Sequence, residues 1–396
     1  MKKYDSYKDS GIDWIGQIPS HWKICKVKNY SDIYSGEPCP AEDQSEDFDN
    51  PIYGGGDILG HSIKPNMPAD TLILGRVGGD GKVRHVKTAF WATDNALIID
   101  TKLNKTFLGN VLNCADLLQY NTSTAQPLLT ATKIKNINIP VPPASEQKEI
   151  ADYLDRKCGE IDAAVAKVEK ELELLDELKQ SEISKAVTKG LNPNVSFKPS
   201  GIDWIGEIPS HWKIMRFKHF ADCRMGETIL GEDLKDIGAI PVYSATLDDS
   251  VFGYVENAKL ILKPNDFVIP ARGNSIGNVS IIKNGIATCT QTTICARNIR
   301  DINIKYLFYC SRAYKESWFY YDATAIPQIT VVQVNNNPVP FPPLSEQKEI
   351  ADYLDRKCGE IDSLKEKLKQ KKEKLQELRQ SLISEVVTGK RCVLNS

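Results

Sequence analysis

Two blocks of this 396-residue sequence occur twice, far apart along the chain. Residues 10–24 read SGIDWIGQIPSHWKI and residues 200–214 read SGIDWIGEIPSHWKI, so the two copies differ at one position and lie 190 residues apart. The second block, SEQKEIADYLDRKCGEID, occupies residues 145–162 and recurs unchanged at residues 345–362. Repeats that stack into solenoids have periods of ~20–50 residues. The longer spacing here predicts two modules, each a head followed by a helix.

The segments between the repeated blocks, 25–140 and 215–340, show little similarity to each other. Either the gene was duplicated and its middle parts drifted, or the shared blocks serve one partner while the middle parts face different targets. The contrast between identical and dissimilar segments favours the second interpretation. The expected boundaries are 1–143 for the first head, 144–190 for a helical spacer, 191–343 for the second head, 344–390 for a second spacer and 391–396 for a tail.

The second block predicts the start of a long helix in each module. Paired prolines at 142–143 and 342–343 end the heads, because proline is excluded from helix interiors. The serine that opens each block stands where a helix N-cap belongs, and the glutamate after it faces the positive end of the helix dipole. We expect helices over residues 145–188 and 345–388.

Apolar residues recur every seven positions through both helices, which is typical of a coiled coil. A helix of about 44 residues is ~65 Å long, too long to bury its apolar seam on one head. We therefore expect the two helices to pack on each other antiparallel, with the heads at opposite ends and a pseudo-twofold relation between the modules. The predicted seam comprises Leu154, Ile161, Val168, Leu175, Leu354, Ile361, Leu368, Leu375 and Leu382, flanked by Cys158, Val165, Leu172, Leu364 and Leu378.

Lysines interleaved with glutamates cover residues 365–377 of the second helix. One interpretation is a solvated helix face. The other is a docking surface for partner helices, since a two-helix rod leaves much of its surface open. The pattern leaves both interpretations open.

Short runs of Val, Ile and Thr between glycine-rich turns predict a mixed sheet in each head, with helices at 107–119 and 304–316. The fold class is therefore α+β: two mixed α/β heads and a long antiparallel two-helix coiled coil. The tryptophans of the first block are expected to pack in the heads, and His21 and His211 beside them are interpreted as structural rather than catalytic.

A basic, glycine-rich segment in each head is a candidate for binding nucleic acid. Glycine lets backbone N–H groups approach phosphate, and Arg or Asn side chains read base edges. Polar segments at 121–130 and 321–330 are equally suited to base contacts. The alternatives are an ordinary charged hairpin and plain loops. The candidates are Arg76, Lys82, Arg84, Lys87 and Gln126 in the first head, and Arg272, Asn274, Lys283 and Gln328 in the second.

The composition and the motifs exclude several classes of protein. A formal net charge of −2 excludes a polybasic tail protein, so any basic surface has to be local. No cysteine and histidine spacing fits a metal site, and no catalytic motif is complete: residues 75–82 resemble a phosphate loop that is one residue too long. The expectation is a chain without catalytic residues, cofactor or metal. The absence of an apolar leader or spanning segment predicts a cytoplasmic protein without a membrane partner.

The GIDWIG-x-IPSHW openings, the PVPPASEQKEIADYLD and PFPPLSEQKEIADYLD junctions and the head–helix–head–helix order resemble a type I restriction–modification specificity subunit. This resemblance covers essentially the whole chain. It implies that each head is a target recognition domain for one half of a split, asymmetric double-stranded DNA site. It also implies that the helices dock two methyltransferase subunits, which restriction/translocase subunits join, and that AdoMet, ATP and Mg belong to those partners.

Two other classes of function remain as alternatives. The chain could be a coiled-coil scaffold that joins two protein partners and never touches DNA. Basic residues spread evenly over the heads would favour that interpretation, whereas a basic cleft on the same side of both heads favours DNA. A chain that cut or methylated DNA unaided would be an enzyme in its own right.

Overall fold

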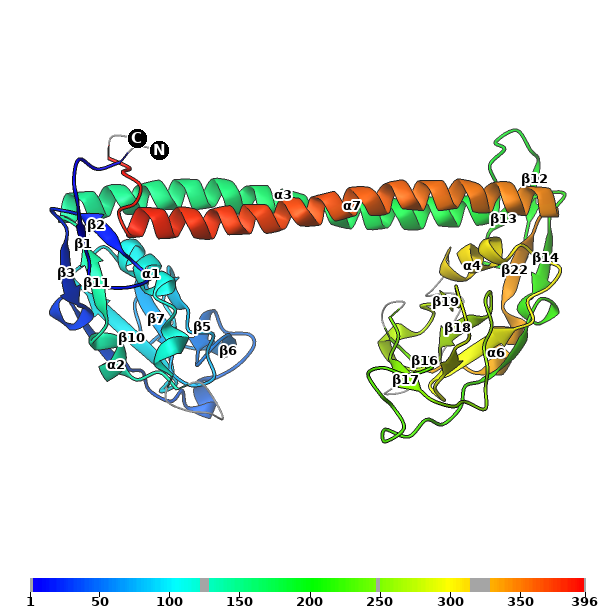
Figure 1. The fold of residues 1–396 in the computed structure, drawn as a ribbon, viewed down its shortest axis with the longest axis horizontal. Coiled ribbons are helices and arrows are strands. Elements are labelled where there is room, and N and C mark those ends of the chain that lie inside the picture. The colour runs from blue at the N-terminus through cyan, green and yellow to red at the C-terminus, as the bar shows by residue number, and fades with distance from the viewer. Residues whose placement is uncertain (1–2, 122–127, 247–249, 314–327, 395–396) are drawn as a thin grey trace. The chain divides into compact units, whose positions relative to one another are not determined.

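The computed structural model describes residues 3–121, 128–246, 250–313 and 328–394. These residues form two compact units: Met1–Glu169 together with Lys369–Ser396, and Lys170–Leu368. Each unit contains one head and one stretch of each long helix, as the colours of Figure 1 show. Within the described ranges, no helix is both long enough and apolar enough to span a bilayer.

The head of unit 1 is built from small sheets and two short helices. A four-stranded antiparallel sheet in the order β4-β10-β7-β8 lies beside a three-stranded sheet in the order β6-β5-β9, and strand pairs β1-β2 and β3-β11 complete the head. The elements are β1 Tyr7–Asp9, β2 Gln17–Pro19, β3 Lys23–Lys26, β4 Ser31–Ser35, β5 Asn50–Tyr53, β6 Ile58–Ser62, β7 Thr71–Gly75, β8 Val83–Val86, β9 Trp91–Ala92, β10 Ala96–Thr101, α1 Lys105–Cys114, α2 Ala131–Lys135 and β11 Asn138–Val141.

The head of unit 2 repeats this topology strand for strand. Its sheets have the orders β15-β21-β18-β19 and β17-β16-β20, with pairs β12-β13 and β14-β22. The elements are β12 Phe197–Pro199, β13 Glu207–Pro209, β14 Lys213–Arg216, β15 Asp222–Met225, β16 Ile240–Tyr243, β17 Gly253–Val255, β18 Phe267–Pro270, β19 Ser280–Ile281, β20 Thr288–Cys289, β21 Thr293–Arg297, α4 Ile304–Ala313, α6 Val331–Asn336 and β22 Pro338–Phe341. The middle segments therefore share a fold although their sequences show little similarity.

The expected α+β class and the two long helices are confirmed. Helix α3 runs over Ala144–Lys189 and helix α7 over Leu344–Val387, within a residue or two of the predicted bounds. Both are followed by a glycine with positive φ, Gly190 at 71° and Gly389 at 75°. Glycine is favoured after a helix because it adopts this left-handed conformation without a Cβ clash.

In each unit the two helices run antiparallel. In unit 1, Asp162 pairs with Arg379 (2.9 Å) while Glu169, seven residues later on α3, pairs with Lys372 (2.7 Å), seven residues earlier on α7. In unit 2, the same opposite progression is seen between the Asp176–Lys365 and Lys179–Asp362 pairs. The antiparallel pairing that the seam predicted is thus confirmed within each unit.

The core of each head extends onto both helices. In unit 1, Leu154 of α3 and Val386 and Val387 of α7 are buried in one cluster with Trp22 of the first block. In unit 2, the corresponding cluster joins Val187 at the end of α3, Leu354 near the start of α7 and Trp212. Burial of this apolar surface, which stabilises by ~25 cal/mol per Å², fixes each head onto a pair of helix ends.

Candidate functional site

The basic segment of the first head is a loop that connects β7 to β8. Glycines hold it tightly against the loop after β5: a Cβ on Gly75 would lie 1.6 Å from the carbonyl oxygen of Gly55, and a Cβ on Gly55 would lie 1.8 Å from that of Val77. Only glycine permits such a close backbone approach. The loop therefore presents its side chains from a fixed backbone, with Lys82 exposed and Arg76 half-buried.

Two of the four cations predicted here are already paired with carboxylates. The guanidinium of Arg84 lies 3.0 Å from Asp80, and Lys87 Nζ lies 3.5 Å from Asp70. Asp70 also accepts hydrogen bonds from Lys105 (3.0 Å) and His85 (2.7 Å), and these hold its pKa at about 2, below its usual range. Among the described residues, Arg76 and Lys82 have no such ion pair, so they carry the available positive charge of this loop.

In the second head, the corresponding segment follows β18. Arg272 is exposed with an extended backbone, Asn274 lies in a short 3-10 turn over Gly273–Ser275, and Lys283 is exposed beyond β19. Gln328 is exposed and forms an antiparallel bridge with Arg272. Of the nine predicted residues, Gln126 lies outside the described part of the chain.

The two basic segments correspond in the structure with a shift of one residue from the match that their sequences give. Aligned on their first arginines, the sequences pair Arg76 with Arg272. Strand pairing, however, places Gly75 opposite Ala96 in one head and Pro270 opposite Thr293 in the other. The residue after Gly75 is Arg76 and the residue after Pro270 is Ala271, so Arg272 shares its position with Val77. A shift of one residue along an extended strand moves a side chain to the opposite face, so the two arginines are not equivalent.

Burial along the helix seam varies with position. Leu154, Val168, Leu354 and Ile361 are buried, whereas Ile161, Leu175, Leu368 and Leu375 are half-buried, as expected where only two helices pack. The flanking assignment of Leu364 and Leu378 is wrong, since these side chains are 50% and 53% exposed. The half-buried cations Lys365, Lys372 and Arg379 occupy the facing positions instead, each paired with an acid on α3.

The lysines of residues 365–377 fall into two groups, which bear differently on the two interpretations of this segment. Lys365 and Lys372 bond across the helix pair, so they are structural. Lys367, Lys369 and Lys371 are exposed, which agrees with a solvated face and leaves docking open.

The identical blocks make the same contacts in both units, which sequence patterns missed. In unit 1, the carboxylate of Glu146 accepts hydrogen bonds from Trp22 Nε1 (3.0 Å) and bonds His21 Nε2 (2.9 Å) and the Tyr4 hydroxyl. Burial and this carboxylate raise the pKa of Tyr4. In unit 2, Glu346 bonds Trp212 (2.9 Å) and His211 (2.7 Å).

The neighbouring glutamine completes this junction between helix and head. Gln147 accepts from the backbone N–H of Asn104 (3.0 Å) and donates to the carbonyl of Pro142 (2.9 Å). Gln347 repeats both bonds, with Asn303 (2.8 Å) and Pro342 (2.8 Å). The duplicated sequences thus attach two dissimilar heads to identical helix starts. Each histidine bonds a glutamate of the helix, which is the kind of contact that a structural histidine makes.

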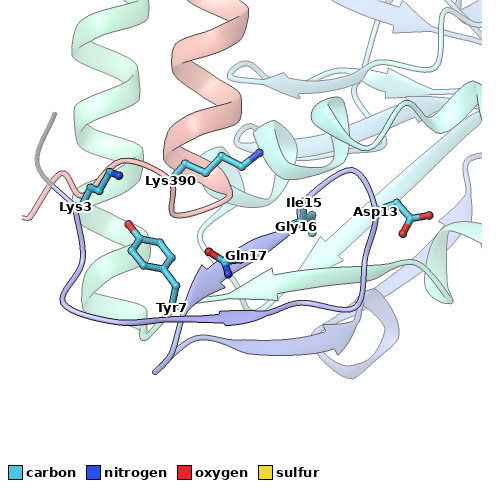
Figure 2. Close-up of a pocket in the computed structure, with 7 residues that line it drawn as sticks. All are labelled: Lys3, Tyr7, Asp13, Ile15, Gly16, Gln17 and Lys390. Atoms are coloured by element: carbon cyan, nitrogen blue, oxygen red, sulfur yellow. The ribbon is translucent and has the colours of Figure 1, made fainter.

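A cavity of about 460 Å³ lies in unit 1 between the first block and the residues after α7. Figure 2 shows its lining, in which Lys3 and Lys390 stand near Tyr7 and Gln17. In unit 2, Lys189 lies over the ring of Phe197 (5.3 Å) and donates to the carbonyl of Glu207 (2.8 Å). Because Phe197 and Glu207 are the counterparts of Tyr7 and Gln17, the two units differ at this place.

The described residues contain no group of three or more His, Cys, Asp or Glu side chains placed to hold a metal ion. The candidate residues lie instead on loops and strand ends of each head, and most of those that the structure describes are exposed.

Comparisons with known proteins identify both heads. A family model described as the type I restriction modification DNA specificity domain matches residues 19–174 and again residues 209–374. The chain is 28% identical over 295 residues to the type I restriction enzyme MjaVIII specificity subunit of Methanocaldococcus jannaschii, covering 69% of this chain and 66% of that relative. It is 26% identical over 277 residues to a putative MjaX specificity subunit of the same organism, covering 67% and 62%.

The matched regions thus span just under two thirds of the length of these relatives. A solved structure from work on complex assembly and conformational transition of the type I R-M system aligns with a TM-score of 0.72. It is 15% identical and covers 93% of this chain and 98% of the other, so it supports the fold.

Proposed function

The chain belongs to the type I restriction modification DNA specificity family, and from this premise we propose that it is the sequence-specific DNA-binding subunit of a restriction–modification complex. Each head would read one half of a bipartite, asymmetric site. The observation that carries the proposal is the pair of family domains, equal in topology and different in the side chains of their exposed loops. A common scaffold with different surfaces suits a site whose halves differ in sequence.

The division of the chain follows from this role. We take residues 1–143 and 191–343 as target recognition domains, 144–190 and 344–390 as helical spacers, and 391–396 as a tail. The spacers have exposed leucines at Leu174, Leu178 and Leu378, which would offer apolar contacts to two methyltransferase subunits.

The chemistry would belong to other chains of the complex. We expect this subunit to be non-catalytic, with AdoMet, ATP and Mg bound by the methyltransferase and restriction/translocase partners. Because the proposed ligand is double-stranded DNA, we expect the chain to act in the cytoplasm. A scaffold that never touches DNA is not favoured, since both heads match a DNA specificity domain.

Exchange of one head tests this proposal. Residues 25–140 are replaced by the equivalent segment of another family member, and the assembled complex is allowed to modify DNA. Sequencing of methylated bases should show one half of the site changed and the other half intact. The reciprocal exchange of residues 215–340 is the matched control and should change the other half. A change in both halves after either exchange would contradict the assignment of one head to one half.

A further inference from the structure

One position in each head brings together two segments that are far apart in sequence. In unit 1, the loop after β7 forms an antiparallel bridge at Val77 and Leu128. In unit 2, the bridge after β18 joins Arg272 and Gln328. A backbone hydrogen bond next to each bridge confirms the match: Leu129 N donates to Arg76 O (2.9 Å) and Ile329 N donates to Ala271 O (3.0 Å).

The segments that follow the two bridges are also equivalent. Thr130 accepts a hydrogen bond from the backbone N–H of Lys133 and caps α2, and Thr330 caps α6 in the same way. The two bridges therefore stand at one structural position, fixed on one side by the four-stranded sheet and on the other by a capped helix. At this position the heads present different chemistry: two apolar side chains in unit 1, and an arginine with a glutamine in unit 2.

The geometry of the bridge brings the two side chains of unit 2 together. Residues directly opposite each other in an antiparallel pair project to the same side, with Cβ atoms ~4.5–5.5 Å apart. Arg272 and Gln328 are both exposed. Among the described residues, Arg272 has no acidic partner within ion-pair distance, whereas Arg300 of the same head is held by Asp222 at 3.2 Å. The guanidinium of Arg272 is therefore available to a ligand.

The backbone under this pair is well anchored. Ala271 donates to the carbonyl of Thr292 (2.9 Å), and its own carbonyl accepts from Ile329. Ser275 Oγ donates to the carbonyl of Arg272 (3.4 Å). Side chains that start from a strand end held on both sides are placed more precisely than side chains of a free loop.

On the basis of the proposed DNA-binding function, we propose that this bridge is the base-reading position of each head. Arginine bonds guanine O6 and N7 in the major groove, and glutamine bonds adenine N6 and N7. The spacing of the opposed side chains suits neighbouring base pairs, which are ~3.4 Å apart along the helix axis. Arg272 and Gln328 thus specify a guanine and an adenine on adjacent base pairs in the half-site of the second head.

The first head uses the same position with different chemistry. Val77 and Leu128 have no side-chain donor or acceptor, and both are half-buried. Apolar side chains distinguish thymine by contact with its methyl group. The two bridges would then give the bipartite site its asymmetry, because equivalent positions in equal folds read different bases.

The test uses the full chain assembled with its methyltransferase partner, with methylated-base sequencing as the measurement. Arg272→Ala should lower discrimination at one guanine position by about 5- to 150-fold. Gln328→Ala should relax the adjacent position. Every position in the other half of the site should keep its requirement. Both residues are exposed, so these variants retain the core packing.

Two further variants sharpen the result. Lys235→Ala removes a cation of the same head that pairs with Glu256 (3.4 Å) and lies outside the bridge, so it should relax no position. Val77→Arg combined with Leu128→Gln transfers the reading pair to the first head, and it should replace a base requirement in that half with guanine next to adenine.

The outcomes separate the two levels of the proposal. If Arg272→Ala and Gln328→Ala lower methylation uniformly while every base requirement persists, the pair contacts phosphate and the inference is overturned. The proposed function would then stand, because the wild-type chain still directs modification to a bipartite site. If the wild-type complex modifies no bipartite site, the proposed function fails, and the inference fails with it.

Discussion

Lys179 on α3 lies 2.7 Å from Oδ1 of Asp362 on α7, and the same pair recurs with the helices exchanged. Arg379 on α7 lies 2.9 Å from Asp162 on α3. Asp162 and Asp362 occupy the same position in the identical blocks, and Lys179 and Arg379 occupy equivalent positions 17 residues further along their helices. A duplicated sequence has therefore produced the same ion pair in each unit, which fixes an equivalent antiparallel register in both.

The coupling between these residues can be measured directly. Because the charges are partly exposed, we expect a double-mutant cycle of Lys179→Ala and Asp362→Ala to give a coupling energy of about 0.3–1 kcal/mol, decreasing at high salt. The cycle of Arg379→Ala and Asp162→Ala is the matched control and should give a similar value. Coupling near zero in both cycles would remove the pairs as determinants of register.

Leucines of α7 should differ sharply in their effect on stability. Leu354 is fully buried against the second head, so Leu354→Ala should lower the free energy of unfolding by about 2–5 kcal/mol. Leu364→Ala, at a side chain that is 50% exposed, should change it by less than about 0.5 kcal/mol. Denaturant unfolding monitored by circular dichroism measures both. Equal losses would show that Leu364 belongs to the core.

The buried carboxylate at the start of α3 should matter more than its duplicate. In Glu146→Gln, the three side chains that bond the carboxylate face a neutral amide with one acceptor oxygen. We therefore expect this variant to lower the free energy of unfolding of unit 1 by about 1–3 kcal/mol. Glu346 bonds two side chains and is 34% exposed, and Glu346→Gln should cost less. Hydrogen exchange of the first turn of each helix separates the two effects. A larger loss at Glu346 would contradict the prediction.

The cations of the first head should differ in their contribution to DNA affinity. Lys82 is exposed without an ion pair among the described residues, so Lys82→Ala should reduce the slope of log K against log salt by about 0.9. Arg84 is neutralised by Asp80, and Arg84→Ala combined with Asp80→Asn should leave the slope unchanged. Filter binding over a salt series measures both. A reduced slope for the double variant would place Arg84 on the phosphate backbone.

The charge cluster around Asp70 should give head 1 a specific acid dependence. Hydrogen bonds from Lys105 and His85 lower the pKa of Asp70 to about 2. The unfolded chain binds the proton at a higher pH, so this stabilisation is complete above about pH 4 and is lost as the pH falls toward 2. Asparagine tolerates the left-handed backbone at this position. In Asp70→Asn, the unfolding midpoint should therefore change less between pH 4 and pH 2 than it does in the wild type. Exposed Asp57→Asn is the control and should keep the wild-type dependence.

The repeated blocks made the helices predictable, because heptad spacing and proline pairs are local signals. The partial burial of Lys365 and Lys372 was not predictable in the same way, because a seam predicted from the spacing of apolar residues contains leucines and leaves lysines out. A long side chain can lie along the seam while its charge reaches an acid on the other helix. Only the register of the two helices shows that Leu364 turns outward while Lys365 faces the partner.

The heads were less predictable than the helices. Their common topology depends on which strands pair, and pairing joins residues as distant as Lys26 and Asn138, or Arg216 and Pro338. A match of Arg76 with Arg272 rests on residue type alone, whereas strand pairing in the sheet shows which residues occupy equivalent positions. The junction formed by Glu146 and Gln147 was missed because its partners come from other parts of the head. The feature of the sequence that could have indicated this junction is the unchanged repetition of the block that contains Glu146 and Gln147.

The division of unit 1 between the two ends of the chain has a consequence for synthesis. Unit 2 is a continuous stretch, Lys170–Leu368, whereas unit 1 needs Lys369–Ser396 to join its first 169 residues. Leu382, Val386 and Val393 supply apolar surface to the core of unit 1. During synthesis, the first head therefore leaves the ribosome first, but part of its apolar core stays exposed until α7 has been made. The core of the second head can be buried earlier, because unit 2 is complete at Leu368.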